Sequence, residues 1–345
     1  MKIYVAGHNG LVGSAILRKL LSKGYNEIIV RSRLELDLTN QFQVNEFFEK
    51  ERPDYVFLAA AKVGGILANT TYPADLIYSN LSIGTNVIHA SYKYGVKKLI
   101  NLGSSCIYPR LAHQPMKEEF LLTGSLEPTN EAYAVAKIAI IKLCRYYNQQ
   151  YGTNFISLMP TNQYGPNDNF NMETAHLLPM LMRRFHLAKL LSKKDFNSIR
   201  SDLKKYPFGY DISGIENDIV LEEVLNKVGA YKNRVIVWGD GSAYRELMHS
   251  DDLADACVYI MENYNAIDIG ELVNITSGQD IQLKELYTLL KDVIGFKGDI
   301  EYNHLYLNGM PRKLMDATKI RSFGWRPKIS LEEGIKMFYK DYVNQ

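Results

Sequence analysis

The chain begins with MKIYVAGHNGLVGSAILRKLLS, residues 1–22, and this stretch decides the fold. A short apolar run at residues 3–6 leads directly into three glycines, and an amphipathic pattern at residues 11–21 follows. Strand, glycine turn and helix in this order are typical of a βαβ unit that binds a dinucleotide pyrophosphate at the helix N-terminus. The predicted contacts to the cofactor are Gly7, Asn9, Gly10, Leu11, Val12 and Gly13.

The alternation of strand and helix patterns continues beyond this unit. Apolar runs at residues 28–30, 55–59, 98–102 and 155–159 alternate with helical patterns at residues 44–48, 81–92 and 133–151. Apolar strands separated by amphipathic helices are what a parallel sheet covered on both faces requires. We predict an α/β fold: a Rossmann-type doubly wound parallel sheet with a smaller C-terminal substrate-binding α/β lobe.

The predicted dinucleotide-binding domain spans residues 1–165, and a later strand and helix near residues 235–275 return to it. Residues 166–345 form mainly the substrate-binding lobe. Within that lobe, the polar segment 192–233 is interpreted as an insertion rather than a core element, with a short helix at residues 220–228. The remaining predicted elements are strands at residues 235–238 and 272–275 and helices at residues 252–262 and 283–294.

Composition excludes several classes of protein. The 345 residues are 46% hydrophobic, which is too apolar for a disordered chain, and 40 Lys+Arg against 38 Asp+Glu lack the basic excess of a nucleic-acid binder. The three cysteines form no CxxC pair, so we expect no metal site and a reducing, cytoplasmic location. No stretch approaches the ~18 apolar residues of a membrane span, and we expect no membrane partner.

The end of the second predicted strand indicates which dinucleotide binds. An acidic residue there binds the ribose hydroxyls of NAD, whereas an arginine accommodates the 2′-phosphate of NADP. Arg31 and Arg33 occupy this place. The sequence therefore favours NADPH/NADP+, with Asp37 as a candidate contact to the adenine.

A candidate catalytic set follows the fourth strand. Ser104 lies at its C-terminal end, and Tyr133 and Lys137 are four residues apart at the start of a helix. Positions i and i+4 share a helix face, so the lysine can lower the pKa of the phenol and make it a usable acid or base. The serine can hydrogen-bond a carbonyl that is being reduced.

These motifs resemble the extended short-chain dehydrogenase/reductases that act on nucleotide sugars, and within them the GDP-L-fucose synthase family. The similarity covers essentially the whole chain except residues 192–233. The segments that carry it are AAAKVGGILANTTYPADLIYSN, LGSSCIYP, EPTNEAYAVAKIA, MPTNQYGPNDNF, RRFH, VWGDGSAYRELMHSDD and GMPRKLMD.

The resemblance implies roles for individual residues. Tyr133 would protonate the C4 oxygen of a 4-keto sugar as hydride arrives from NADPH, Lys137 would assist it and hold the ribose, and Ser104 would polarise the ketone. Cys106 and His176 would act as the acid/base pair that inverts C3 and C5 before reduction. The resemblance also implies a homodimer.

The same resemblance places the GDP-linked 4-keto sugar against Asn162, Arg184, Trp238, Arg245 and Lys313. Segment 192–233 looks about forty residues longer than the family's usual connection and lies between two of these contacts. A C4-reductase without epimerase activity, acting on a GDP-4-keto-heptose in surface-polysaccharide biosynthesis, is therefore an alternative. A catalytically silent dinucleotide sensor is a second one, although such proteins typically lose the tyrosine or the lysine.

Overall fold

A computed structural model describes residues 1–305 and 310–344, with the backbone alone for residues 66–68. The chain forms two compact units. The first comprises Met1–Asn167, Glu246–Gln279 and Leu314–Ser330, and the second comprises Asp168–Arg245, Asp280–Lys313 and Leu331–Gln345. The chain therefore passes between the units five times.

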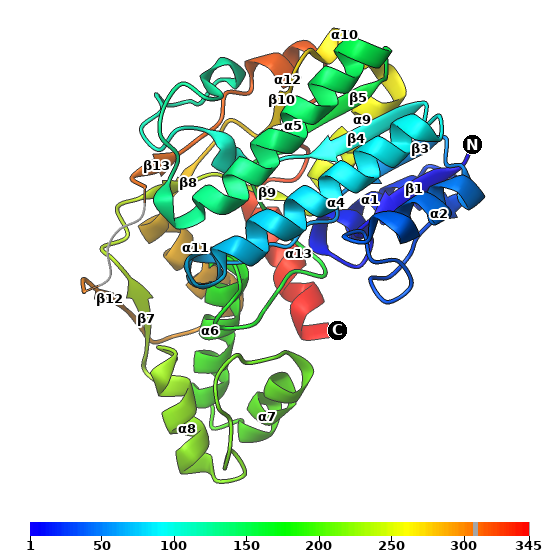
Figure 1. Ribbon diagram of the computed structural model, residues 1–345. Helices are drawn as coiled ribbons and strands as arrows, with labels where there is room; N and C mark the ends of the chain where they lie inside the picture. Colours follow the sequence, from blue (N-terminus) through cyan, green and yellow to red (C-terminus); the bar gives the residue numbers. More distant parts are fainter. Residues whose placement is uncertain (306–309, 345) are drawn as a thin grey trace. The chain divides into compact units, whose positions relative to one another are not determined.

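The first unit is built on a parallel sheet of six strands in the order β10-β5-β4-β3-β1-β2 (Figure 1). The strands are β1 (Ile3–Ala6), β2 (Ile28–Ile29), β3 (Tyr55–Leu58), β4 (Lys98–Leu102), β5 (Phe155–Pro160) and β10 (Val273–Ile275). A separate parallel pair joins β6 (Asn162–Tyr164) to β9 (Leu247–His249).

The helices of this unit are α1 (Leu11–Ser22), α2 (Gln41–Glu51), α3 (Ile66–Thr71), α4 (Pro73–Lys93), α5 (Glu131–Tyr151), α9 (Ser250–Asn263), α10 (Ala266–Ile269) and α12 (Thr318–Ser322). Local sequence sets several of their ends. The Asn40 side chain accepts hydrogen bonds from two amides of the first turn of α2, and α5 ends at Gly152, whose φ of 64° suits glycine. Figure 1 shows α4 and α5 side by side.

Alternation along β1 shows how both faces of the sheet are covered. Ile3 and Val5 belong to a buried cluster that includes residues of α1 and α9. Tyr4 and Ala6 belong to a second cluster that includes residues of α2, α4 and α5. Because successive side chains of a strand point to opposite faces, helices bury both faces, and the predicted Rossmann-type fold is confirmed.

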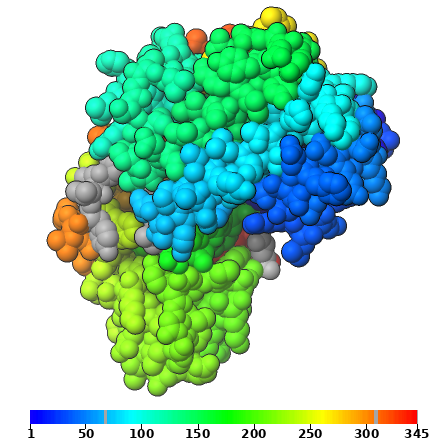
Figure 2. Space-filling view, in the orientation of Figure 1, coloured from blue at the N-terminus to red at the C-terminus, as the bar shows by residue number. Residues whose placement is uncertain are grey.

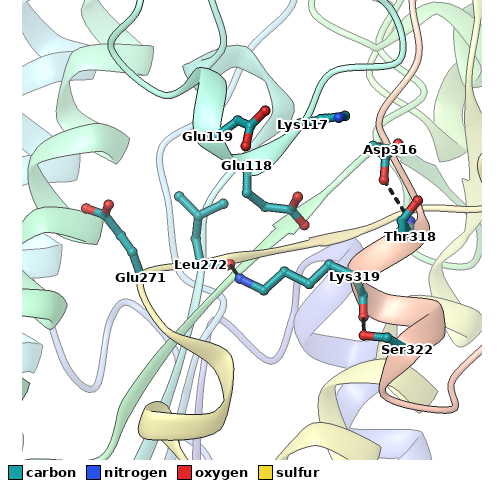
Figure 3. Close-up of a pocket in the computed structure, with 9 residues that line it drawn as sticks. All are labelled: Lys117, Glu118, Glu119, Glu271, Leu272, Asp316, Thr318, Lys319 and Ser322. Atoms are coloured by element: carbon teal, nitrogen blue, oxygen red, sulfur yellow. Dashed lines mark hydrogen bonds between the residues drawn. The ribbon is translucent and has the colours of Figure 1, made fainter.

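The edge strand β10 is protected by side chains. A hollow of about 510 Å³ beside it is lined by charged residues, which Figure 3 shows. The Glu118 carboxylate accepts the Asn274 N–H at 3.0 Å, and Lys319 Nζ donates to the Leu272 carbonyl at 2.7 Å. Because unpaired groups of an edge strand invite pairing with other chains, we assign this charged hollow to edge protection.

The second unit carries α6 (Leu177–Ser192), α7 (Phe196–Lys205), α8 (Asp218–Lys227), α11 (Leu283–Ile294) and α13 (Leu331–Asn344). Its strands are β7 (Arg234–Trp238), β8 (Tyr244–Arg245), β11 (Ile281–Gln282), β12 (Asp299–Asn303) and β13 (Arg312–Lys313). β7 pairs with β12, and β8 lies between β11 and β13 in a small three-stranded sheet.

Segment 192–233 belongs to the core of this unit, contrary to its interpretation as a peripheral insertion. It forms α7 and α8, which bury Ile199 and Leu221 completely. The fully buried guanidinium of Arg183 on α6 donates from Nε to the Asp202 carboxylate on α7 at 2.9 Å. The expected helix at residues 220–228 corresponds to α8, whereas α7 was not predicted, although Phe196, Ile199 and Leu203 recur at helical spacing.

The two returns to the first unit differ from the expected one. β7 pairs with β12 in the second unit, so only residues 246–275 of the expected range 235–275 lie in the first. A second return, Leu314–Ser330, was not predicted. Its one short helix, α12, is too brief to produce a recognisable periodic pattern.

Candidate active site

The glycine turn after β1 is shaped for close approach of a ligand. Gly7 has a φ of 86°, and a Cβ added to Gly13 would lie 2.1 Å from the Gly7 carbonyl oxygen. Gly10 is the N-cap of α1, and the first turn of that helix contains no acidic residue. The backbone N–H groups at a helix start, with the helix dipole, favour an anion, so this turn fits the pyrophosphate of a dinucleotide.

The structure distinguishes the two arginines after β2. Arg31 is engaged, because its Nη2 donates to the Glu51 carboxylate at 2.8 Å and its Nη1 donates to the Val30 carbonyl. Arg33 lies exposed in the following turn. Asp37 accepts hydrogen bonds from the N–H and hydroxyl of Thr39, so its carboxylate already holds the turn before α2. Arg33 is therefore the better candidate for a 2′-phosphate.

Ser104, Tyr133 and Lys137 lie together at the C-terminal end of β4. Ser104 caps a short 3₁₀ turn, Ser105–Ile107, and its side chain hydrogen-bonds Tyr133. Lys137 Nζ donates to the Leu102 carbonyl at 2.8 Å and lies 5.8 Å from the centre of the Tyr133 ring. The main chain of β4 thus fixes the ammonium beneath the phenol, as the spacing of the two residues on α5 requires.

Burial, rather than the lysine, dominates the pKa of Tyr133. Desolvation raises that pKa well above its usual value, and the Ser104 hydrogen bond lowers it only in part. Desolvation also lowers the pKa of Lys137 to about 8. Burial therefore opposes the expected lowering of the Tyr133 pKa by Lys137. Tyr133 is held as a phenol, the form that can donate a proton.

Cys106 lies next to this group, with one neighbour that the motifs did not identify. Asn130, at the N-terminal end of α5, donates from Nδ2 to Cys106 Sγ at 3.4 Å instead of capping the helix, and its Oδ1 is buried. Asn130 precedes Tyr133 by three residues. Asn130 belongs to the segment EPTNEAYAVAKIA that carries the resemblance, but an asparagine there is also an ordinary N-cap residue, so it was given no role.

His176 and Arg184 lie in the second unit, His176 just before α6 and Arg184 within it. His176 is the N-cap of α6, and desolvation, with the positive charge of Lys313 as the second cause, lowers the pKa of its imidazole. Arg184 is buried and donates from Nη1 to the Ile236 carbonyl at 2.7 Å. A lowered pKa keeps His176 neutral and able to accept a proton near neutral pH.

The other predicted substrate contacts come from short strands and their ends. Arg245 on β8 and Lys313 on β13 are paired residues of the small sheet, and Arg245 Nη1 also donates to the Met310 carbonyl at 2.7 Å. Trp238, at the end of β7, is half-exposed. In the first unit, Asn162 Nδ2 donates to the Glu246 carbonyl at 3.0 Å.

Two hollows of the first unit contain none of the predicted site residues. One is the charged hollow beside β10, and the other, of about 700 Å³, is lined by residues between Pro109 and Pro128. Within the described part of the chain, no helix combines the length and hydropathy of a membrane span. Among the same residues, no group of three or more His, Cys, Asp or Glu is placed to hold a metal ion.

Comparison with known proteins assigns the family. The model of the NAD dependent epimerase/dehydratase family matches residues 3–210 and 207–276. "GDP-L-fucose synthase 1" of Arabidopsis thaliana is 51% identical over 99% of this chain and 93% of its own length. The chain belongs to this family, in its GDP-L-fucose synthase branch. The resemblance inferred from the motifs is thereby confirmed. The expectation that residues 192–233 exceed the family's usual length is wrong, because the match to the GDP-L-fucose synthases of Arabidopsis thaliana and Escherichia coli extends over 99% of this chain and 93–96% of theirs.

Two solved structures from Campylobacter jejuni are also similar. The first is "a GDP-6-OMe-4-keto-L-xylo-heptose reductase", 42% identical, with a TM-score of 0.93 over 100% of this chain and 98% of that one. The second, "MlghC, GDP-mannoheptose C4 reductase", has NADP bound and is 43% identical, with a TM-score of 0.86 over 99% and 98%. The family member described here is an NADPH-dependent nucleotide-sugar enzyme, as predicted.

Proposed function

We propose that this chain reduces the C4 ketone of a GDP-linked 4-keto-6-deoxy sugar, as a GDP-L-fucose synthase does. The observation that carries the proposal is the arrangement of Ser104, Tyr133 and Lys137 at the end of β4. The glycine turn after β1 and exposed Arg33 support the use of NADPH. The names of the similar proteins support the GDP-sugar class.

The residues at the end of β4 account for the reductive step. NADPH, when bound, supplies the hydride that adds to C4 of the sugar. The Tyr133 hydroxyl gives its proton to the carbonyl oxygen, so that a C4 hydroxyl forms and the tyrosine is left as phenolate, which solvent protons restore. Ser104 donates a hydrogen bond to the same oxygen, and the Lys137 ammonium stabilises the phenolate.

Inversion at C3 and C5 is the finer part of the proposal. A C4 ketone acidifies the neighbouring carbons, so removal of a proton from one face and its return to the other inverts each centre. Cys106 and His176 are the proposed acid/base pair. Two features support them: Asn130 orients the Cys106 sulfur, and the lowered pKa of His176 leaves its imidazole neutral.

A heptose substrate without epimerisation is the second candidate. It is favoured by the two Campylobacter jejuni structures, whose names state reduction of GDP-heptoses and which match this chain over nearly its full length. Residues 192–233 do not discriminate between the two substrates, because the match to the GDP-L-fucose synthases extends over them as well. The catalytically silent sensor has no such support, because Tyr133 and Lys137 are both present and Lys137 Nζ lies 5.8 Å from the centre of the Tyr133 ring.

A substrate panel separates these functions. We expect NADPH oxidation with GDP-4-keto-6-deoxymannose, with GDP-4-keto-heptose, or with both. No turnover with either would reject the reductase proposal. In a parallel incubation in D₂O with oxidised cofactor, deuterium should enter C3 and C5, and Cys106→Ser and His176→Gln should each abolish this exchange. Reduction without deuterium exchange would support a C4-reductase that has no epimerase activity.

We also propose that the protein is a homodimer that pairs through α4 and α5. On α5, Val135, Ala139 and Tyr146 form an exposed stripe, and α4 exposes Tyr78 and Tyr92. Figure 2 shows the surfaces of both helices on the visible face. Exposed apolar stripes at helical spacing are typical of an interface.

The mass in solution tests this pairing. Ala139→Glu should convert the dimer to a monomer, because it places a charge in the proposed interface. Leu21→Glu, at an exposed apolar position on α1, should leave the dimer intact. A dimer that persists in Ala139→Glu would exclude this surface. Light scattering after size-exclusion chromatography measures the mass.

A further inference from the structure

The buried Glu246 carboxylate accepts hydrogen bonds from main-chain N–H groups at two other points in the chain. It has no exposed surface, and its Oε1 accepts the N–H of Ser277 at 2.7 Å and that of Gly278 at 3.2 Å. The hydroxyls of Thr276 and Ser277 donate to the same oxygen. Oε2 accepts the N–H of Met315 at 3.2 Å. Three of the five donors are backbone groups, which move only if the chain itself moves.

These partners lie beside the points where the chain passes from one unit to the other. Glu246 itself begins the second segment of the first unit, Ser277 and Gly278 lie just before its end at Gln279, and Met315 is the second residue of the third segment. Glu246 therefore lies at one of the five points where the chain passes between the units, and its side chain hydrogen-bonds residues next to two others.

Candidate substrate contacts adjoin each end of this arrangement. Arg245 is bonded covalently to Glu246, and Lys313 precedes Met315 by two residues. These two residues pair with each other in the sheet of β8 and β13. The Glu246 carbonyl also accepts Asn162 Nδ2. A displacement of Glu246 would therefore shift Arg245 and Lys313 through the main chain and Asn162 through its hydrogen bond.

We propose that Glu246 is a positioning residue for the sugar-nucleotide site: its buried carboxylate fixes the passages of the chain that carry Arg245 and Lys313 and the carbonyl that holds Asn162. The inference rests on the proposed function, because it takes these three residues as the substrate contacts. It gives Glu246 no contact with substrate or cofactor. The glycine turn and the Ser104, Tyr133 and Lys137 group are held by other bonds.

Glu246→Gln tests this role with little change in volume. The amide oxygen can replace Oε1, but the amide NH₂ then faces the Met315 N–H, donor against donor. The tie to residues 314–315 is lost while the others remain. Asp252→Asn is the matched control: Asp252 is 2% exposed and accepts the N–H groups of Lys328 and Ile329 with its two oxygens, but no candidate substrate contact adjoins those residues.

The experiment uses the full chain, with GDP and NADP+ as separate titrants in calorimetry. We expect Glu246→Gln to weaken GDP binding about tenfold or more, which is about 1.4 kcal/mol, and to leave NADP+ binding within about twofold. In steady-state assays KM for the sugar nucleotide should rise with kcat nearly retained, the signature of lost substrate binding. Asp252→Asn should lower the melting temperature and leave GDP affinity unchanged.

The outcomes separate the inference from the function on which it rests. Wild-type protein that fails to bind GDP would reject the substrate assignment and the inference with it. Wild-type protein that binds GDP, together with a Glu246→Gln variant of equal GDP affinity, would overturn the inference alone. Equal loss of GDP and NADP+ affinity, or equal effects of Glu246→Gln and Asp252→Asn on GDP affinity, would also overturn it, since either result indicates general loosening.

Discussion

The two units hold their candidate functional residues in different ways. In the first, Ser104, Tyr133 and Lys137 come from the end of β4 and the start of α5 and are tied to each other or to the β4 main chain. In the second, Arg184 and Arg245 are cations bonded to backbone carbonyls of loops and short strands. In the proposed function, the first unit carries the reductive chemistry and the second carries charges for an anionic substrate. Changes in the two should affect different kinetic constants.

Tyr133→Phe should have the largest effect of these substitutions on the rate of reduction. The substitution removes the proton donor but keeps the ring, and general acid catalysis contributes about 10²–10⁴-fold. We expect kcat for NADPH oxidation to fall by about that factor, with GDP and NADP+ affinities unchanged. Stopped-flow absorbance of NADPH measures the rate. A decrease of less than about tenfold would mean that another group supplies the proton.

Asp202→Asn should loosen the second unit alone. The substitution leaves the Arg183 guanidinium buried without its carboxylate, which typically costs about 3–5 kcal/mol. It also removes the acceptor of the Tyr342 hydroxyl on α13. We expect a lower melting transition, with GDP binding weakened and NADP+ binding retained. Glu332→Gln, which breaks the exposed pair with Lys336, should leave the melting curve unchanged. A melting temperature of Asp202→Asn equal to that of the wild-type protein would contradict the core role of α7.

Local patterns predicted the first unit better than the second. The glycine turn, Ser104 and the Tyr133–Lys137 spacing each lie within one continuous segment, where strand and helix periodicity fix the geometry. Asn130 was missed because its partner, Cys106, is 24 residues away in sequence. The sequence could not rank Arg31 and Arg33 either, since the ion pair between Arg31 and Glu51 depends on how α2 packs.

The second unit depends on contacts that no local pattern reveals. Residues 192–233 were taken as peripheral because they are polar, yet Arg183 and Asp202 neutralise each other inside the core. The return of residues 314–330 to the first unit rests on a short helix and on the burial of Ala317, Ile320 and Trp325 in the core of that unit. The sequence placed a lysine near Tyr133 but could not show the burial of the phenol, which depends on the complete fold and raises its pKa.

Arg33→Ala and Arg31→Ala test which of the two arginines binds the 2′-phosphate of NADPH. Hydrogen bonds to charged groups contribute about 1.5–3 kcal/mol, so loss of Arg33 should reduce the preference for NADPH over NADH by about 10–100-fold. Arg31→Ala should change this preference by less than about threefold, because Arg31 already pairs with Glu51. Ratios of kcat/KM for the two cofactors measure the effect. The opposite order would make Arg31 the phosphate contact.

The pH dependence of reduction is the smallest effect and reports on Lys137. Its pKa is lowered to about 8, so the ammonium is present below that pH and is lost as pH rises through it. The Tyr133 pKa is raised, so the phenol stays protonated across the same range. We expect kcat to fall above about pH 8, with about one tenth of the enzyme still carrying the ammonium one pH unit higher.

Lys137→Arg keeps the charge at every accessible pH, so its profile should be flat there even if its activity is low. A descending limb that persists in this variant would assign the titration to a group other than Lys137.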